Sequence, residues 1–286
     1  MSGGHTGETL FVLITMLRQL DSKRLILVVE GFEDDAVLDG HINETNINVL
    51  ISGSKIAILR LCDLLHVNHI SYAVGLIDRD LDDLTGRSSS YPPNVVATHA
   101  YDLVADVLLT NPDLLLRALK SQNRDASRVV ESTCSGSISD VVFQLVISLS
   151  VLRLLNESFD FGLSFVNFPF FKILNSDYSV KSSEEILVFA NIRSSSTVEF
   201  SEIEPHLATA MHSINSDRRH CGGHDIIGAS IAIMRQGGDK ALSKSNLVKS
   251  ISTAISCNVM VRLPIYKQIE NWAASNSSAA FDCSPL

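Results

Sequence analysis

Acidic side chains follow two apolar runs of the sequence at the point where each run ends. Glu30 comes directly after Leu25–Val29, and Asp78 and Asp80 come after Tyr72–Ile77. Short continuous Val/Ile/Leu runs bounded by turn residues are typical of buried parallel strands. The carboxyl ends of such strands form the crevice where an open α/β sheet binds its ligands. We therefore expect these three carboxylates to meet at one sheet edge, where their oxygens would bind Mg²⁺ or Mn²⁺.

The elements that would position these acids alternate along the first hundred residues. Apolar runs at Ile47–Ile51 and Asn94–Thr98 predict two further strands. Apolar positions at helical spacing predict helices over about Glu8–Leu20 and Ile56–Leu65, and an acidic first turn at Phe32–Leu38 favours another. This βαβ order, with right-handed crossovers, predicts an α/β fold with a parallel sheet flanked by helices.

The pattern turns mainly helical after Tyr101. We predict a catalytic domain with an N-terminal helix over residues 1–110 and a mainly helical region over residues 111–286. Two short strand candidates interrupt the helical region, at Phe161–Phe165 and Ile186–Phe189. The tail from Ala273 to Leu286 is small and polar, and we expect it to be poorly ordered.

The composition is that of a soluble globular protein, with 45% hydrophobic and 19% charged residues. Apolar runs such as Val141–Ile147 are too short to span a bilayer. No basic segment precedes an apolar one at the start of the chain, so we expect no secretory signal, no membrane partner and a cytoplasmic location. The five cysteines lie far apart without a CxxC pair, which suggests reduced thiols and neither a disulfide framework nor a zinc site.

A net charge of −9 argues against strong constitutive binding of nucleic acid. It does not exclude a nuclease whose site is charged by metal ions. Phosphate contacts would then come from a partner, a dimer groove or a local basic patch. The candidate patches are Arg87; Arg117, Lys120, Arg124 and Arg128; and Arg218, Arg219 and His220.

Three segments together resemble a Toprim domain, namely Val28–Asp34, Ile51–Lys55 and Gly75–Asp80. That domain is the catalytic module of topoisomerases, bacterial primases and the overcoming-lysogenization-defect (OLD) nucleases. The sequences VEGFED, SGSK and DRD are closest to a Toprim-like group that often sits beside ABC-type ATPases and includes the toxic nuclease subunit of the PARIS phage-defence system. Weaker similarity extends over Thr98–Leu103, Cys221–Ile226 and Leu263–Trp272, so that nearly the whole chain is covered although only its first hundred residues are specific.

The resemblance implies roles for several side chains. Glu30 would be a metal ligand or general base, and Asp78 and Asp80 would be metal ligands. Asp34, four residues after Glu30, could be an outer ligand or simply an acid that the helix dipole favours. Lys55 could contact phosphate or be a solvated lysine at a strand end.

Two histidines complete the candidate substrate-binding set. His99 follows the fourth predicted strand, where a phosphate or supporting role competes with packing. His224 follows Gly222 and Gly223, where we expect a helix to start. A role in nucleic-acid binding or in the structure is a further possibility for this residue. A zinc site at His220, Cys221 and His224 is disfavoured because no second Cys/His pair lies at zinc-site spacing.

One position departs from the family pattern. The resemblance leads us to expect a glutamate two residues after Asp102, and this chain has Val104. Asp102 or Asp106 could substitute for it, or the carboxylate could be dispensable. This departure weakens the site assignment there and leaves room for an altered or inactive centre.

The resemblance implies a Mg²⁺-dependent nuclease that acts as the toxic effector of bacterial anti-phage defence. It would be restrained by a partner ABC-type ATPase, would form a homodimer when active, and would cut RNA, tRNA included, rather than DNA. The alternative is a catalytically weak, Toprim-shaped regulatory subunit of an ATPase complex, for which Val104 is the best support. A primase-like or topoisomerase-like enzyme is disfavoured, because neither a zinc ribbon nor a domain with a transesterifying tyrosine is recognisable.

Overall fold

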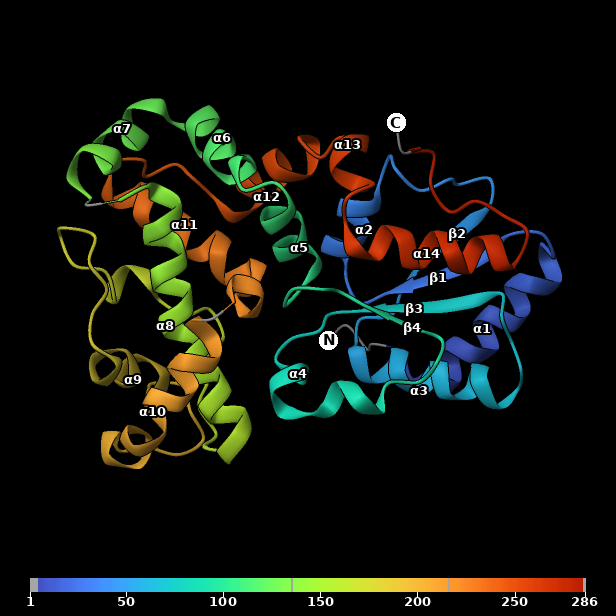
Figure 1. The fold of residues 1–286 in the computed structure, drawn as a ribbon, viewed down its shortest axis with the longest axis horizontal. Helices are drawn as coiled ribbons and strands as arrows, with labels where there is room; N and C mark the ends of the chain where they lie inside the picture. The colour runs from blue at the N-terminus through green and yellow to red at the C-terminus, as the bar shows by residue number, and fades with distance from the viewer. Residues whose placement is uncertain (1–4, 135, 216, 285–286) are drawn as a thin grey trace. The chain divides into compact units, whose positions relative to one another are not determined.

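The computed structural model describes residues 5–134, 136–215 and 217–284. These residues form two compact units (Figure 1), the first made of 1–110 and 255–286 and the second of 111–254. The expected boundary at residue 110 coincides with the end of the first segment. The expectation differs from the structure at the other end, because residues 255–286 pack with the sheet rather than with the helical region.

The first unit is built on a four-stranded, all-parallel sheet with the strand order β2-β1-β3-β4. Its strands are β1 (Leu25–Val29), β2 (Ile47–Ile51), β3 (Ala73–Ile77) and β4 (Val95–Ala97). The central strands β1 and β3 are buried at all five positions, as their unbroken apolar sequences predict. Because all four strands run the same way, their carboxyl ends lie at one edge.

The helices α1 (Gly7–Leu20) and α3 (Lys55–Val67) pack against each other, and α3 packs against β3. Both helices start at polar caps: Thr6 forms a capping box on α1, and the Ser54 side chain accepts a hydrogen bond from the Ala57 N–H on α3. Their apolar faces bury residues such as Leu10 and Ile58 in one core with the sheet. A β-carbon at Gly75 would lie 2.3 Å from Cγ2 of Ile58, so the absence of a side chain there lets α3 approach β3.

The other helices of this unit cover the acidic ends of the strands and the β4 edge. They are α2 (Phe32–Leu38), α4 (Asp82–Thr85), α5 (Leu103–Thr110), α13 (Cys257–Met260) and α14 (Pro264–Ser275), with a short 3₁₀ helix η1 at Arg87–Ser90. The helix α2 packs against β2 and α5, whereas α14 packs against β4. Trp272 on α14 donates a hydrogen bond of 2.8 Å to the carbonyl of Ser71, which leads into β3.

Residues 276–284, after α14, pack against the rest of the first unit, contrary to expectation. Phe281 is buried, stacks on Tyr266 and forms an antiparallel bridge with Ile42. Cys283 is bonded to Cys257 in a disulfide, with His41 Nδ1 at 3.2 Å from Cys283 Sγ. The expectation that all five cysteines are reduced thiols is therefore wrong for this pair. Nothing in the spacing of the two cysteines signals the contact, which the return of the chain to the first unit creates.

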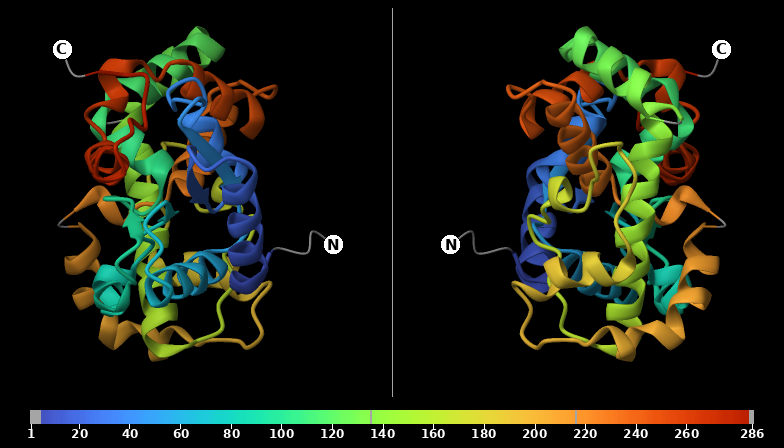
Figure 2. Two further views of the ribbon diagram at one scale, coloured as in Figure 1. Left: turned by 90° about the vertical axis from the view of Figure 1, so that its right-hand side faces the viewer. Right: turned by 90° about the vertical axis from the view of Figure 1, so that its left-hand side faces the viewer.

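The second unit is helical. It contains α6 (Asp113–Gln122), α7 (Arg124–Thr133), α8 (Ile138–Phe159), α9 (Ser183–Asn191), α10 (Phe200–Asn215), α11 (Gly223–Gln236) and α12 (Lys244–Thr253), with 3₁₀ helices η2 (Phe170–Lys172) and η3 (Arg218–His220). The long α8 runs through this unit (Figures 1 and 2) and packs against α10, α11 and α9. The predicted strand Ile186–Phe189 lies inside α9, and Phe161–Phe165 forms no strand, so both strand predictions are wrong.

By length and composition, α8 is the one helix among the described residues that could cross a membrane. In the structure, 67% of its most apolar window is buried within the chain. Burial of Val142, Leu145 and Leu149 against neighbouring helices accounts for its hydropathy.

Candidate active site

Two predicted carboxylate positions meet where β1 and β3 end. Glu30 directly follows β1 and Asp78 directly follows β3, and the two strands are neighbours. The Asp78 backbone N–H donates a hydrogen bond of 2.8 Å to Oε1 of Glu30. The side chain of Glu30 therefore reaches across the sheet edge to the turn that carries Asp78.

Asp34 joins this edge from the first turn of α2. It is buried, and its Oδ2 accepts a hydrogen bond of 2.9 Å from the Gly31 N–H at the start of that helix. Burial raises the pKa of Asp34 to about 6, against the hydrogen bonds that lower it. Asp34 is thus both a helix-capping acid and a neighbour of the other two carboxylates. The two predictions for this residue, an outer metal ligand and an acid favoured by the helix dipole, therefore do not exclude each other.

The pKa values of Glu30 and Asp78 are raised in this buried and negatively charged surrounding. Burial raises the pKa of Glu30 to about 7, with further repulsion from Asp80 and Asp34. Burial raises the pKa of Asp78 to about 10, followed by repulsion from Asp102, Asp34, Glu30 and Asp80. Shifts of this size in a group of mutually repelling acids are typical of functional sites.

Asp102 is one of the two candidate substitutes for the glutamate that the resemblance predicts at position 104. Val104 is buried in α5 and carries no charge, whereas repulsion from buried Asp102 is the largest cause, after burial, of the raised pKa of Asp78. Asp106 is committed elsewhere, since its two oxygens accept hydrogen bonds from the backbone N–H groups of His99 and Ala100. Of the two substitutes considered, the structure brings Asp102 to the carboxylate group.

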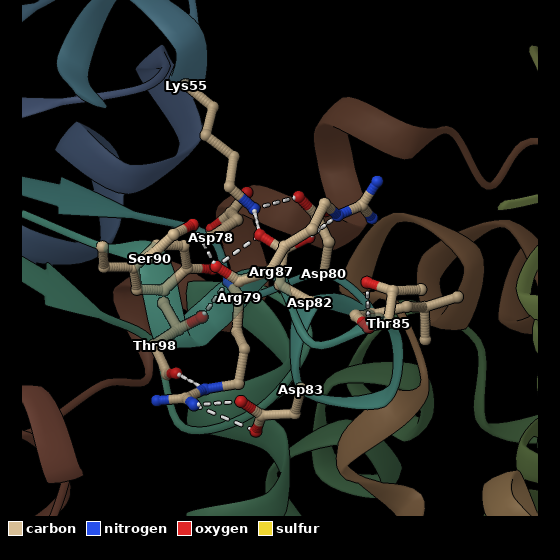
Figure 3. Close-up of polar contacts among 12 residues, drawn as sticks. Lys55, Asp78, Arg79, Asp80, Asp82, Asp83, Thr85, Arg87, Ser90 and Thr98 are labelled. Carbon is tan, nitrogen blue, oxygen red and sulfur yellow. Dashed lines mark hydrogen bonds and ion pairs between the residues drawn. The ribbon is translucent and has the colours of Figure 1, made fainter. Parts of the chain in front are cut away.

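Asp80 and Lys55 are paired with each other. The Lys55 ammonium lies 2.6 Å from Oδ2 of Asp80 and 2.7 Å from Oδ2 of Asp82 (Figure 3). The two aspartates raise the pKa of Lys55, although its burial acts in the opposite direction. Lys55 is therefore a partly buried ion-pair partner and not a solvated lysine. The charge of the Asp80 carboxylate is already paired with the Lys55 ammonium.

Asp82 follows the DRD triplet in a polar segment, yet it is buried rather than solvated. Its side chain is 7% exposed and accepts hydrogen bonds from Arg87 Nε and the Tyr91 hydroxyl, each 2.6 Å long. Sequence reasoning missed this residue because its partners come from three separate turns. Asp83, by contrast, is partly exposed and pairs with Arg79.

Arg79, between the two site aspartates, anchors their loop to the end of β4. Its backbone N–H and Nε donate to Oγ1 and the carbonyl of buried Thr98, at 2.9 and 2.6 Å. Asp80 has a positive φ of 53°, and its N–H donates to the carbonyl of Tyr101. The DRD triplet is thus held as a turn in which Asp78 and Asp80 face different neighbours.

The two histidines lie in different units. His99 is exposed beside Asp106 at the end of β4, in the same unit as the carboxylates. His224 lies in the second unit, in the first turn of α11, which confirms the expected helix start there. Its role in binding stays a prediction.

A hard divalent cation fits the chemistry of the donor set at this edge. Carboxylate oxygens are the ligands that Mg²⁺ and Mn²⁺ prefer. Among the described residues, the group whose ligand atoms all lie within 4.8 Å of one another is His41, Cys257 and Cys283, and the carboxylates of Glu30, Asp34 and Asp78 do not form such a group. The disulfide occupies both sulfurs of that group, which leaves a single imidazole as a ligand.

A hollow of about 470 Å³ adjoins the Lys55 ion pairs within the first unit. Asp80 and Asp82 line it together with the apolar side chains of Ile56 and Leu59. Tyr91 also lines it, with a hydroxyl whose pKa burial and the Asp82 carboxylate raise. The hollow gives a ligand access to one side of the acidic turn.

Comparison with known proteins adds no relative to this picture. No protein-family model matches the chain, and no curated protein is significantly similar to it. The fold and the site therefore define the class: an α/β protein with a parallel sheet, a carboxylate group at the carboxyl ends of its central strands, and a helical second unit.

Proposed function

We propose that this chain is a metal-dependent, Toprim-like nuclease that hydrolyses phosphodiester bonds. One observation carries the proposal: Glu30, Asp34 and Asp78 share one sheet edge, where burial and repulsion raise each pKa. A divalent cation would relieve that repulsion, and such a cation stabilises the negative charge that develops on phosphate oxygens during hydrolysis.

Glu30, Asp34 and Asp78 would hold the cation, and Asp102 would support Asp78. The cation would supply positive charge to the phosphate oxygens. Glu30 would act either as a ligand of the cation or as a general base, and burial raises its pKa to about 7 in the metal-free chain. Lys55 would keep Asp80 in place and present positive charge at the adjoining hollow.

The biological setting of the proposal rests on the sequence resemblance. The nuclease would be the toxic effector of a cytoplasmic anti-phage system, would act on RNA in preference to DNA, and would be restrained by an ABC-type ATPase until infection. A homodimer would be the active form.

A regulatory subunit with weak catalysis is the second candidate. It is favoured by the Lys55–Asp80 ion pair, in which an ammonium already neutralises one of the expected metal ligands, and by the neutral Val104. This candidate would use the same surface to report to a partner without cutting nucleic acid.

The deciding experiment is controlled expression in a bacterial host, with and without an ABC-type ATPase encoded beside the gene. Wild type is compared with Glu30→Ala and Asp78→Ala, and with Asp125→Ala, whose side chain is 90% exposed on α7. Growth is followed while total RNA and DNA are run on gels. Growth arrest with new discrete fragments, lost in the first two variants and kept in the third, supports the nuclease. Intact nucleic acid in every strain, phage-infected cells included, contradicts it and favours the regulatory subunit.

A further inference from the structure

The second unit contains a cavity of about 1230 Å³ whose wall combines aromatic rings with positive charge. It is formed by α8, the segment around η2, the end of α9, α11 and the start of α12. Its size exceeds that of most sites for a single small molecule, about 300–1000 Å³. The cavity is also widely open to solvent, so that an extended ligand can continue beyond it.

Four phenylalanines form the aromatic part of the wall. They fall within seven residues and are Phe165, Phe168, Phe170 and Phe171. The Phe168 and Phe170 rings meet edge to face at 5.5 Å, and Phe170 is seated against Gly228, where a β-carbon would come within 2.8 Å of it. Phe171 is 62% exposed, so that one ring of the set is offered to a ligand.

Five cations and one carboxylate belong to the wall among the described residues. The cations are Arg153, Arg193, Arg235, Lys240 and Lys244. The carboxylate, Asp225, is paired with Arg153 at 3.0 Å. This local excess of positive charge stands out in a chain whose net charge is −9, and it meets the need for phosphate contacts that the acidic composition raises.

Two of the cations, Arg193 and Arg235, are each oriented by a hydrogen bond to a backbone carbonyl. Arg193 donates to the Val166 carbonyl at 3.1 Å, and Arg235 donates to the Leu242 carbonyl at 3.2 Å. A guanidinium has five N–H donors, so one bond orients the side chain and leaves donors for a ligand. Lys244 lies 2.9 Å from Nδ1 of His224; because an ammonium can only donate, Nδ1 accepts and Nε2 carries the proton.

We propose that this cavity binds single-stranded nucleic acid, with a base stacked on the exposed ring of Phe171 and phosphates held by the arginines and lysines. Rings that stack bases and cations that follow the backbone are the two features that such sites share. An acidic peptide would use the charges but not the rings. The inference rests on the proposed function, since it names the part of the chain that holds the substrate of the nuclease.

The first test measures binding of a fluorescein-labelled, 12-nucleotide single-stranded RNA to the full chain by anisotropy, with EDTA present to prevent cleavage. The pocket variant is Arg235→Glu/Lys240→Glu, and its matched control is Lys181→Glu/Lys249→Glu, in which two lysines of the same unit lie outside the wall. Phe171→Ala removes the exposed ring without a change of charge. Circular dichroism confirms that each variant is folded.

We expect wild type and the control to bind alike, and both pocket variants to bind at least about tenfold more weakly. The slope of log affinity against log salt should fall by about 1.4 in the double pocket variant, because two phosphate contacts are lost. Equal loss in the pocket and control doubles, or no binding by wild type, overturns the inference. Competition by polyglutamate as effective as that by unlabelled RNA overturns it as well. Competition by AMP at the same nucleotide concentration as effective as that by the RNA assigns the cavity to free nucleotides and also overturns it.

Cleavage is measured separately with Mg²⁺ or Mn²⁺, so that the two proposals fail differently. If wild type binds the RNA through the pocket but never cuts nucleic acid, the result supports the binding site and contradicts the proposed nuclease activity. If the pocket variants change neither cleavage nor binding, the result contradicts the proposed binding site and supports the nuclease activity.

Discussion

The backbone N–H of Asp78 donates a hydrogen bond of 2.8 Å to the side chain of Glu30. This bond links the ends of the two central strands and places one site carboxylate against the backbone of the other. Because it uses only a carbonyl-like oxygen of Glu30, a glutamine at this position can keep the bond while it removes the charge.

Glu30→Gln should make the metal-free protein less sensitive to pH. The pKa of Glu30 is raised from its ordinary value of 4.5 to about 7 by burial. Between these values the folded chain holds more protons than the unfolded chain, so the free energy of unfolding falls as the pH rises. The glutamine removes this fall, a gain at pH 8 of at most about 3 kcal/mol relative to wild type.

Urea unfolding in EDTA at pH 5 and pH 8 measures this difference. Glu44→Gln, at an exposed turn, is the control and should follow wild type. Added Mg²⁺ should stabilise wild type at pH 8 more than the glutamine variant. A glutamine variant with the pH dependence of wild type would mean that Glu30 does not titrate in the crowded site.

Lys55→Met should destabilise the chain by about 1–3 kcal/mol, because it leaves Asp80 and mostly buried Asp82 without their shared ammonium. Arg87 and Tyr91 still donate to Asp82, which limits the loss. Lys120→Met, which removes a surface pair with Glu131, should change stability by less than about 1 kcal/mol. Thermal melts at neutral pH compare the two. Equal melting temperatures would show that the Lys55 ion pairs contribute no net stability.

Gly75→Ala should cost about 1–3 kcal/mol, since its β-carbon would lie 2.3 Å from Ile58 Cγ2 and 2.9 Å from Cys62 Sγ. Gly136→Ala is the matched control, because its β-carbon would meet only the Asp140 side chain at 3.6 Å. The urea midpoints of the two variants and wild type give the comparison. A Gly75→Ala midpoint that matches the control would show that α3 can move away from the sheet without loss.

Three thiols should react in the denatured chain purified without reductant, and five after reduction, because Cys257 and Cys283 are disulfide-bonded. Loss of the bond should lower stability by about 3 kcal/mol through the loop that it closes. Cys283→Ser measures this loss against Cys134→Ser, which alters a free thiol. Five reactive thiols before reduction would rule out the bond in the purified protein.

The strands could be predicted from the sequence because their signal is local. Leu25–Val29 and Ala73–Ile77 are unbroken apolar runs, and burial on both faces of a parallel sheet requires such runs. The same rule failed at Ile186–Phe189, where four apolar residues sit inside a helix that starts at a capping box formed by Ser182 and Glu185. A short apolar run does not by itself distinguish a strand from a buried helical turn.

The partners within the site could not be predicted in the same way. That Glu30 and Asp78 lie at one edge follows from strand order, whereas the burial of Asp82 depends on Lys55 and Tyr91, which arrive from turns on other elements. The contact between Cys257 and Cys283 depends on the path of the tail, which carries no periodic pattern. Long-range polar contacts of this kind are determined by packing rather than by local sequence.

The chain leaves the first unit at Thr110 and returns to it at Ile255, with the whole second unit between. During synthesis, the four strands and the site carboxylates emerge early, but α14 and the tail that cover β4 and Ile42 emerge only after the second unit. In a ribosome-bound chain, the sheet with its acidic edge therefore lacks the cover of α14 and the tail until residues 255–286 have been made.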